Sequence, residues 1–166
     1  MTNISKINLL DSRSQKLRKI CIQIGKEGGE NASHIGGALS CIDFIVGADD
    51  IFHYSSSAER LKSLVLSKGH ACLSLYSLMI EAGIVNEEQV KSTFEKNNSK
   101  FLGHPCRNLE LGISFSTGSL GNGLAHSAGK ALKRMNNKEA DNIPVTCIVG
   151  DGECNEGIIW ETLEFI

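Results

Sequence analysis

Apolar residues recur every three or four positions in the first part of the chain, which is the spacing of one face of a helix. The positions that show it most clearly are Leu17, Ile20, Cys21 and Ile24. Two glycines at 28 and 29 follow them and are typical of a helix end, so we predict that the first helix ends there. The same spacing predicts further helices over residues 38–46, 69–83, 86–94 and 121–135, and from residue 156 onward.

Two short apolar runs without helical spacing lie between these helices: LKSLVLS (61–67) and IPVTCIVG (143–150). Short apolar runs bounded by turn residues are typical of strands, and we expect the second to be a buried strand. Strands that alternate with helices favour a parallel arrangement. The predicted fold class is therefore α/β, with a parallel sheet and helices on both of its faces.

The composition narrows the class of protein. A chain of 166 residues, with 41% hydrophobic and 22% charged residues, has enough material for one globular domain with a core. The net charge of −2 gives no sign of nucleic-acid binding, and no apolar run reaches the roughly 20 residues that cross a bilayer. The N-terminus lacks the apolar region of a signal peptide, so we expect a cytoplasmic location. The six cysteines contain no CxxC pair and are expected to be buried thiols.

Glycine-rich turns fall at the predicted junctions between strands and helices. They are SKGH (67–70), STGSLGNG (116–123) and GDGE (150–153), and a further turn, SHIGG (33–37), is expected to join the first two helices. Ligands bind at the carboxyl ends of parallel strands, and glycine lets phosphate groups approach the backbone closely. Asp151 at the end of a strand suits Mg²⁺, which often bridges a carboxylate to phosphates. The residues alone therefore predict a metal–diphosphate site at Asp151, with backbone from Gly150 and Gly152.

Three of the five histidines lie in glycine-containing segments that are expected to face a ligand: His34 and His70 in these turns, and His104 in a loop, GHP (103–105). Each by itself has a structural interpretation, but three near one sheet edge favour a substrate site, because imidazoles bind hydroxyls and move protons. His53 and His126 have no such context and are expected to be ordinary surface or core residues. Two other interpretations stay open here. GDG is also a common turn without a ligand, and STGSLGNG resembles a dinucleotide-binding loop, although only loosely.

Four blocks of sequence, in one order, resemble a known family. They are SHIGGALSCIDF, LVLSKGHACLSLYSLM, LGHPCRNLELGISFSTGSLGNGLAHSAGKAL and VTCIVGDGECNEGIIWETLEF. Together they resemble the N-terminal, diphosphate-binding part of transketolase, most of all the split form in which a short N-terminal subunit pairs with a separate C-terminal one. The resemblance runs from about Ile20 to Ile166. It implies that residues 1–166 are a partial thiamine-diphosphate-binding domain that ends just after the GDG motif.

The resemblance also implies cofactors and residues that hold them. Asp151 matches the aspartate that binds Mg²⁺, and Gly150 and Gly152 match glycines that give the diphosphate of thiamine diphosphate close access. Gly118 and Leu120 match residues that hold the aminopyrimidine and press against the cofactor rings.

Further residues match groups that act on substrate or lie at an interface. His70 matches a histidine near both cofactor and substrate, and His34 and His104 match histidines that contact donor hydroxyls and help move protons. Glu156 matches a glutamate beside the cofactor at a dimer interface, so we expect a homo-oligomer. The implied reaction transfers a two-carbon ketol unit from a ketose phosphate to an aldose phosphate.

Two departures from the family pattern change the activity that we expect from this chain. Ser33 precedes His34 where glycine is usual, and the Asn that supplies a second metal ligand would lie beyond Ile166, as would the pyrimidine-binding domain. We therefore expect activity only with a pyrimidine-domain partner, and none from this chain alone. Two alternatives stay open: another thiamine-diphosphate enzyme, such as one like 1-deoxyxylulose-phosphate synthase, and a non-catalytic remnant that serves as an interaction module.

Overall fold

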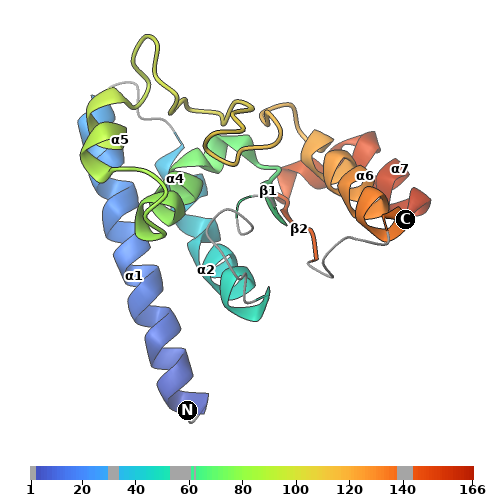
Figure 1. The fold of residues 1–166 in the computed structure, drawn as a ribbon, viewed down its shortest axis with the longest axis horizontal. Coiled ribbons are helices and arrows are strands. Elements are labelled where there is room, and N and C mark those ends of the chain that lie inside the picture. The colour runs from blue at the N-terminus through green and yellow to red at the C-terminus, as the bar shows by residue number, and fades with distance from the viewer. Residues whose placement is uncertain (1–2, 30–33, 53–60, 62, 138–143) are drawn as a thin grey trace. The chain divides into compact units, whose positions relative to one another are not determined.

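The structure, a computed structural model, describes residues 3–29, 34–52, 61, 63–137 and 144–166 (Figure 1). Ser33 and His53 lie outside these residues. The described chain is mostly helical. In order, its elements are α1 (Asn3–Gly28), α2 (Ile35–Phe52), β1 (Leu64–Leu66), the 3-10 turn η2 (Gly69–Ala71), α4 (Cys72–Glu81), α5 (Glu87–Thr93), α6 (Asn122–Asn136), β2 (Thr146–Ile148), the 3-10 turn η3 (Gly152–Asn155) and α7 (Gly157–Phe165).

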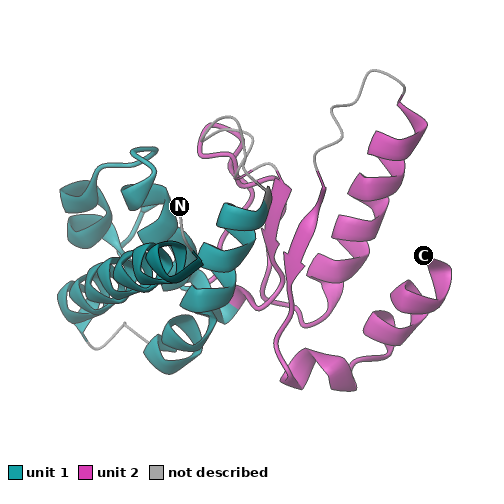
Figure 2. Ribbon diagram, turned by 90° about the horizontal axis from the view of Figure 1, so that it is seen from below, with its two compact units in different colours: residues 1–53, 70–103 teal, residues 54–69, 104–166 magenta. Residues whose placement is uncertain are grey.

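The chain divides into two compact units, which Figure 2 shows in separate colours. Unit 1 comprises Met1–His53 and His70–Gly103, and unit 2 comprises Tyr54–Gly69 and His104–Ile166. Each unit has its own core and is described by itself.

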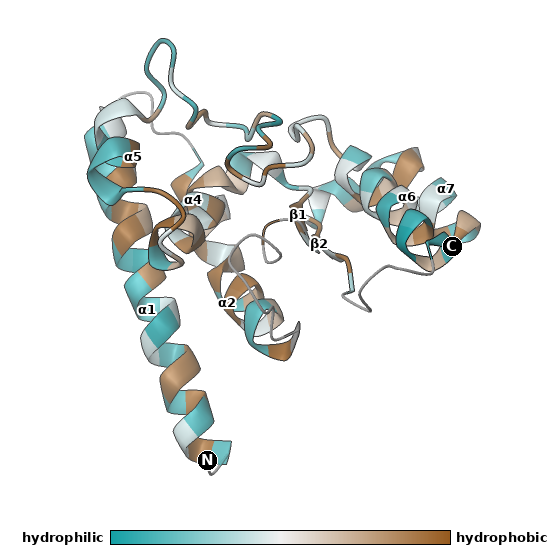
Figure 3. Ribbon diagram, in the orientation of Figure 1, coloured by the Kyte–Doolittle hydropathy of each residue, from teal (hydrophilic) through white to brown (hydrophobic). Residues whose placement is uncertain are grey.

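Unit 1 is a cluster of helices in which α1 packs against α2, α4 and α5. The side chains that α1 buries include Leu17, Ile20, Cys21 and Ile24, which confirms the predicted apolar face. Its exposed positions are mostly polar, although four large apolar residues are exposed as well, and hydrophilic and hydrophobic bands alternate along α1 in Figure 3. The exposed apolar residues are Ile4, Ile7, Leu9 and Ile22. α4 is buried along most of its length, from Cys72 to Met79. Burial of these apolar faces stabilises the unit because it removes them from water.

An ionic cluster ties three helices of unit 1 together. Arg13 on α1 donates two hydrogen bonds to Glu81 on α4, of 2.6 and 2.7 Å, and pairs with Asp49 on α2 at 2.5 Å. Hydrogen bonds to Glu81 and then Asp49 hold the pKa of Arg13 above its usual value, although burial opposes the shift. The planar guanidinium suits this role because it offers several donors in a fixed fork.

The boundaries of α4 and α5 follow local chemistry. Gly83 has a φ of 69° just beyond α4, a backbone conformation that glycine adopts without strain. The side chain of Asn86 accepts a hydrogen bond of 3.0 Å from the backbone N–H of Gln89, so Asn86 is the N-cap of α5. Both predicted helix limits are confirmed. The prediction that SHIGG is a turn is wrong for the last residues of this segment, because Gly36 and Gly37 already lie in α2.

Unit 2 contains the predicted parallel sheet, which is small. Within the described residues it has two strands, with Leu64 of β1 paired to Thr146 of β2 and Leu66 to Ile148. α6 packs on both strands and α7 packs on α6. β1 is fully buried, but β2 is only half-buried, contrary to the prediction. Pairing does not explain the difference, because each strand pairs only with the other among the described residues. Helices on both faces stay a prediction.

The cysteines are only partly as expected. All six are thiols outside any disulfide; Cys21, Cys41 and Cys72 are buried, whereas Cys106 and Cys154 are exposed. The prediction that they are buried is wrong for the last two, because they lie in a loop and in η3. Burial raises the pKa of both the Cys21 and Cys72 thiols to about 12. Among the described helices, none has the length and apolar character needed to span a membrane.

Candidate functional site

One buried carboxylate joins the three glycine-rich turns of unit 2. Glu153, in η3, is 1% exposed, and its Oε1 accepts hydrogen bonds of 2.7 Å from the Ser67 hydroxyl and from the Gly121 N–H. Its Oε2 accepts a third bond of 2.7 Å, from the Gly150 N–H. Ser67 follows β1, Gly121 precedes α6 and Gly150 precedes Asp151. The junctions that the sequence pointed to are therefore brought together around Glu153.

Close backbone contacts reinforce this arrangement. A Cβ on Gly69 would lie 2.7 Å from the carbonyl carbon of Thr117, and a Cβ on Gly123 would lie 2.5 Å from the Cα of Ser67. Neither space accepts a side chain. Glycine at these two positions therefore allows the turn that follows β1 to pack directly against the 116–123 loop.

The 116–123 loop also meets His104. Gly118 has a φ of +146°, and a Cβ on it would lie 3.1 Å from Cδ2 of the His104 ring. The His104 side chain is exposed, and Leu120 beyond it is 38% exposed. The Thr117 hydroxyl oxygen is buried and has no hydrogen-bond partner among the described residues. A buried hydroxyl without a partner is costly, so this loop has an unused polar group beside an exposed ring.

Asp151 lies at the carboxyl end of β2, where the chain turns into η3. Its side chain is exposed, and a Cβ on the neighbouring Gly152 would meet nothing within 4 Å. Gly150 is buried, with the stem of Lys68 3.5 Å from the position of its absent Cβ. Glu156 is exposed, and its side chain does not cap α7. The arrangement leaves one exposed carboxylate with open space beside its backbone.

The other two predicted histidines lie together in unit 1. The rings of His34 and His70 are 5.5 Å apart between centroids and meet edge to face. His34 has a φ of 65°, which is uncommon for a residue other than glycine and marks a tight turn into α2. A Cβ on Gly37 would lie 3.0 Å from Cδ2 of His70, so the glycine makes room for that ring.

His126 has a different setting. Its ring stacks on Phe115 with 4.3 Å between centroids and an interplanar angle of 11°. Burial, and to a lesser degree the charge of Lys130, lowers the pKa of His126. The ring packs as part of unit 2, as expected for a residue outside the site.

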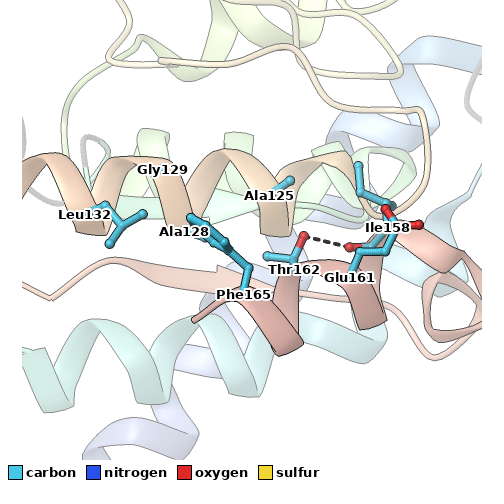
Figure 4. A pocket seen from close by; sticks show the side chains of 8 residues that line it. All are labelled: Ala125, Ala128, Gly129, Leu132, Ile158, Glu161, Thr162 and Phe165. Atoms are coloured by element: carbon cyan, nitrogen blue, oxygen red, sulfur yellow. Dashed lines mark hydrogen bonds between the residues drawn. The ribbon is translucent and has the colours of Figure 1, made fainter.

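An apolar groove between α6 and α7 is separate from these turns (Figure 4). Its volume is about 470 Å³, and Thr162 beside it donates a 2.6 Å hydrogen bond to the Ile158 carbonyl. The lining residues are Ala125, Ala128, Gly129, Leu132, Ile158, Glu161, Thr162 and Phe165. None of the predicted site residues is among them, and Glu161 is its one ionisable side chain. The groove therefore lacks the chemistry of a diphosphate site.

Sequence reasoning missed Glu153, Ser67 and the Thr117 hydroxyl. The one available signal for Glu153 was its place directly after GDG, at the end of a predicted strand. An acidic residue in that place is more often exposed than buried, and only the packing of Ser67 and Gly121 around it reveals its role.

Comparison with known proteins identifies relatives of the chain. Residues 54–166 match the family model described as "Transketolase, thiamine diphosphate binding domain". The 6-deoxy-6-sulfo-D-fructose transketolase subunit SqwG of Clostridium sp. (strain MSTE9) is 31% identical over 163 residues, which cover 94% of this chain and 56% of that protein. One subunit of the apulose-4-phosphate transketolase of Actinobacillus succinogenes is 34% identical over 97 residues, covering 58% of this chain and 34% of that subunit.

A solved structure shares the fold. The transketolase of Campylobacter jejuni superposes with a TM-score of 0.74 at 27% identity, over 95% of this chain and 26% of that one. The chain thus spans about half, or much less, of the length of the relatives it matches; for bovine transketolase-like protein 2 the share is 16%.

Proposed function

This chain belongs to the transketolase family, through its thiamine diphosphate binding domain, and on that premise we propose that it is the N-terminal, diphosphate-binding part of a working transketolase. The reaction is transfer of a two-carbon ketol unit from a ketose phosphate to an aldose phosphate. The observation that carries the proposal is the exposed Asp151 at the end of β2, between two glycines and joined through Glu153 to the 116–123 loop.

The residues of unit 2 fit a diphosphate and a divalent metal ion. The exposed Asp151 carboxylate would hold Mg²⁺, and the open space at Gly152 leaves room for phosphate oxygens next to the backbone. No group of three His, Cys, Asp or Glu side chains gathers as a metal site in the described part of the chain, so Asp151 would be one ligand among others that these residues do not supply. When bound, thiamine diphosphate supplies the carbanion chemistry of ketol transfer.

Other residues of the 116–123 loop would meet the organic part of the cofactor. The half-exposed Leu120 offers an apolar surface for its rings, and Gly118 allows the backbone to approach. The buried Thr117 hydroxyl offers a hydrogen bond that the described residues leave unused. Glu156 would lie beside the cofactor, where a second subunit completes the site.

Three histidines would bind the donor sugar. His34 and His70, together in unit 1, and His104, in unit 2, have side chains that would bind donor hydroxyls and help to move protons. His70 would also contact the cofactor. The protein's contribution is thus to orient the donor and to place proton acceptors beside it.

The chain would work with a partner subunit that carries the pyrimidine-binding domain, and the complex would be a homo-oligomer of such pairs in the cytoplasm. Support comes from SqwG and from the apulose-4-phosphate relative, both named as transketolase subunits. Their own sugars are properties of those proteins. For this chain we propose a ketose phosphate as donor and an aldose phosphate as acceptor.

The test is reconstitution of the pair. The chain is purified alone and together with a pyrimidine-domain subunit from the same genome, and ketol transfer is measured with thiamine diphosphate and Mg²⁺. We expect turnover only from the pair. Turnover by the 166-residue chain alone would contradict the proposal that the active site is shared between this chain and a partner subunit. A pair that binds no thiamine diphosphate would leave the interaction module as the better description.

A further inference from the structure

We propose that Glu153 is a positioning residue, whose buried carboxylate sets the orientation of the Gly150–Asp151 turn and locks that turn to the 116–123 loop. What the Asp151 carboxylate binds rests on the proposed function above; how the turn is held does not. Asp151 is exposed, and a Cβ on the neighbouring Gly152 would meet nothing within 4 Å. The Asp151 and Gly152 carbonyls accept bonds of 3.1 and 3.4 Å from within η3, from Cys154 and Asn155. The bonds at Gly150 are the ones that tie this turn to the buried side chain of Glu153.

The Gly150 peptide groups are held by two hydrogen bonds to Glu153. Its N–H donates to Oε2 of Glu153 at 2.7 Å, and the backbone of Glu153 donates back to the Gly150 carbonyl at 3.1 Å. Both polar groups of Gly150 are thus fixed by one residue three positions on. Since the peptide before Asp151 sets the direction of its Cα–Cβ bond, this pair determines where the Asp151 carboxylate points.

The same carboxylate holds the far end of the 116–123 loop. The Gly121 N–H donates to Oε1, and Gly121 has a φ of +80°, a conformation that favours glycine. A Cβ on Gly121 would lie 2.5 Å from the side chain of Ile158, so the loop end is closely packed as well. One side chain therefore sets the relative position of two parts of the proposed site. These are the Gly150–Asp151 turn, which would hold the metal, and the 116–123 loop, which would meet the cofactor rings.

Three donors converge on the side chain of Glu153, and in these bonds both of its oxygens act as acceptors. The Ser67 hydroxyl and the Gly121 N–H share Oε1, and the Gly150 N–H takes Oε2. A carboxylate only accepts, whereas an amide of the same shape has one accepting oxygen and one NH₂ group. In Glu153→Gln the oxygen is expected to keep the two donors at Oε1, which sets the NH₂ group against the Gly150 N–H.

The test compares amide hydrogen exchange in the 166-residue chain and in Glu153→Gln. In the parent, the Gly150 and Gly121 amides should exchange slowly, because each donates to a buried acceptor. In Glu153→Gln the Gly150 amide should exchange at least about tenfold faster, and the Gly121 amide should change less. Glu164→Gln, the same change at an exposed position of α7, should alter neither.

A second measurement separates positioning from general stability. Ile113→Val shortens a buried side chain of unit 2 that takes no part in the Glu153 cluster. Each variant is assembled with the pyrimidine-domain subunit, and thiamine diphosphate with Mg²⁺ is titrated into the pair well below the unfolding temperature of the variant. Glu153→Gln should weaken binding about tenfold, since it displaces the Asp151 ligand, and Ile113→Val should leave binding unchanged at a similar loss of Tm.

The outcomes are distinct. An unchanged Gly150 amide in Glu153→Gln overturns the positioning role, and so does fast exchange of that amide in the parent, which needs no variant to fold. Binding losses that track Tm equally in Glu153→Gln and Ile113→Val also overturn it. If the parent, assembled with the pyrimidine-domain subunit, binds no thiamine diphosphate, the proposed function fails by itself, and the exchange data still decide the role of Glu153 in the turn.

Discussion

The His104 ring lies against the bare backbone of Gly118, with Cδ2 only 3.1 Å from the place that a Cβ would occupy. The backbone there, at a φ of +146°, disfavours any side chain. Gly118→Ala should therefore destabilise unit 2 by about 1–3 kcal/mol and push the ring aside. Urea unfolding measures the first effect, and donor-saturation kinetics of the assembled enzyme measure the second as a raised KM. Gly129→Ala, where a Cβ meets nothing within 4 Å, is the control, and equal stability of the two variants would contradict the account.

Removing the His104 ring altogether should affect substrate and spare cofactor. His104→Ala is expected to raise KM for the donor ketose about fivefold, because one hydrogen bond to a hydroxyl is lost. Thiamine diphosphate affinity should stay as in the parent, since the exposed ring does not belong to the metal side of the site. Calorimetric titration beside steady-state kinetics checks both. A weakened cofactor affinity with an unchanged KM would show that His104 contacts the cofactor and not the donor.

Asp151→Asn tests the metal assignment. The change is nearly isosteric and the side chain is exposed, so the fold should persist. An amide offers one neutral oxygen to Mg²⁺ in place of a carboxylate, so cofactor affinity at limiting Mg²⁺ should fall at least about tenfold. Raising Mg²⁺ and cofactor together should restore much of it by mass action. Cofactor affinity equal to that of the parent at limiting Mg²⁺ would show that the metal lies elsewhere.

Arg13→Met should weaken unit 1. It leaves Glu81 and the buried Asp49 without their shared cation, and the loss of one partner of a buried ion cluster costs about 3 kcal/mol or more. Because a fifth of the Arg13 side chain is exposed, we expect about 2 kcal/mol after solvent screening. Arg18→Met, which removes a pair with the largely exposed Asp43, should cost at most about 1 kcal/mol. Chemical unfolding followed by circular dichroism compares the two, and similar losses would contradict the buried role.

His126 should make stability depend on pH. Its pKa is lowered in the folded chain, so the unfolded chain binds the proton more readily. The stability contributed by the neutral ring is therefore complete above about pH 6.5, the usual histidine pKa, and is lost as the pH falls through the lower folded value. His126→Phe keeps a ring stacked on Phe115 and removes the titration. Unfolding free energies between pH 5 and 8 should differ in slope between the two chains; parallel curves would refute the assignment.

The helices were largely predictable because their signals are local. The apolar stripe of α1 and the Asn86 cap need only neighbours three or four positions away. The same is true of the glycine-rich turns, whose place after apolar runs indicated the site. Even here α2 begins earlier than predicted, since Gly36 and Gly37 are tolerated inside its first turn.

What could not be predicted depends on packing between distant segments. No local pattern indicates that β2 is half-buried while its partner β1 is fully buried, and η3 is too short to show a period. Glu153 differs in no local way from an exposed glutamate, yet its donors come from 86 and 32 positions away. The grouping of His34 with His70 likewise depends on the packing of α2 beside α4.

The uneven exposure of the cysteines provides a ready means of observing the site. A maleimide dye near neutral pH should react with Cys106 and Cys154, while Cys21 and Cys72, buried and with pKa values of about 12, stay unlabelled. Cys154 lies in η3, and its backbone N–H bonds to the Asp151 carbonyl at 3.1 Å. Once Cys106→Ser confines the label to Cys154, a fluorophore there would register movement of the Asp151 turn directly.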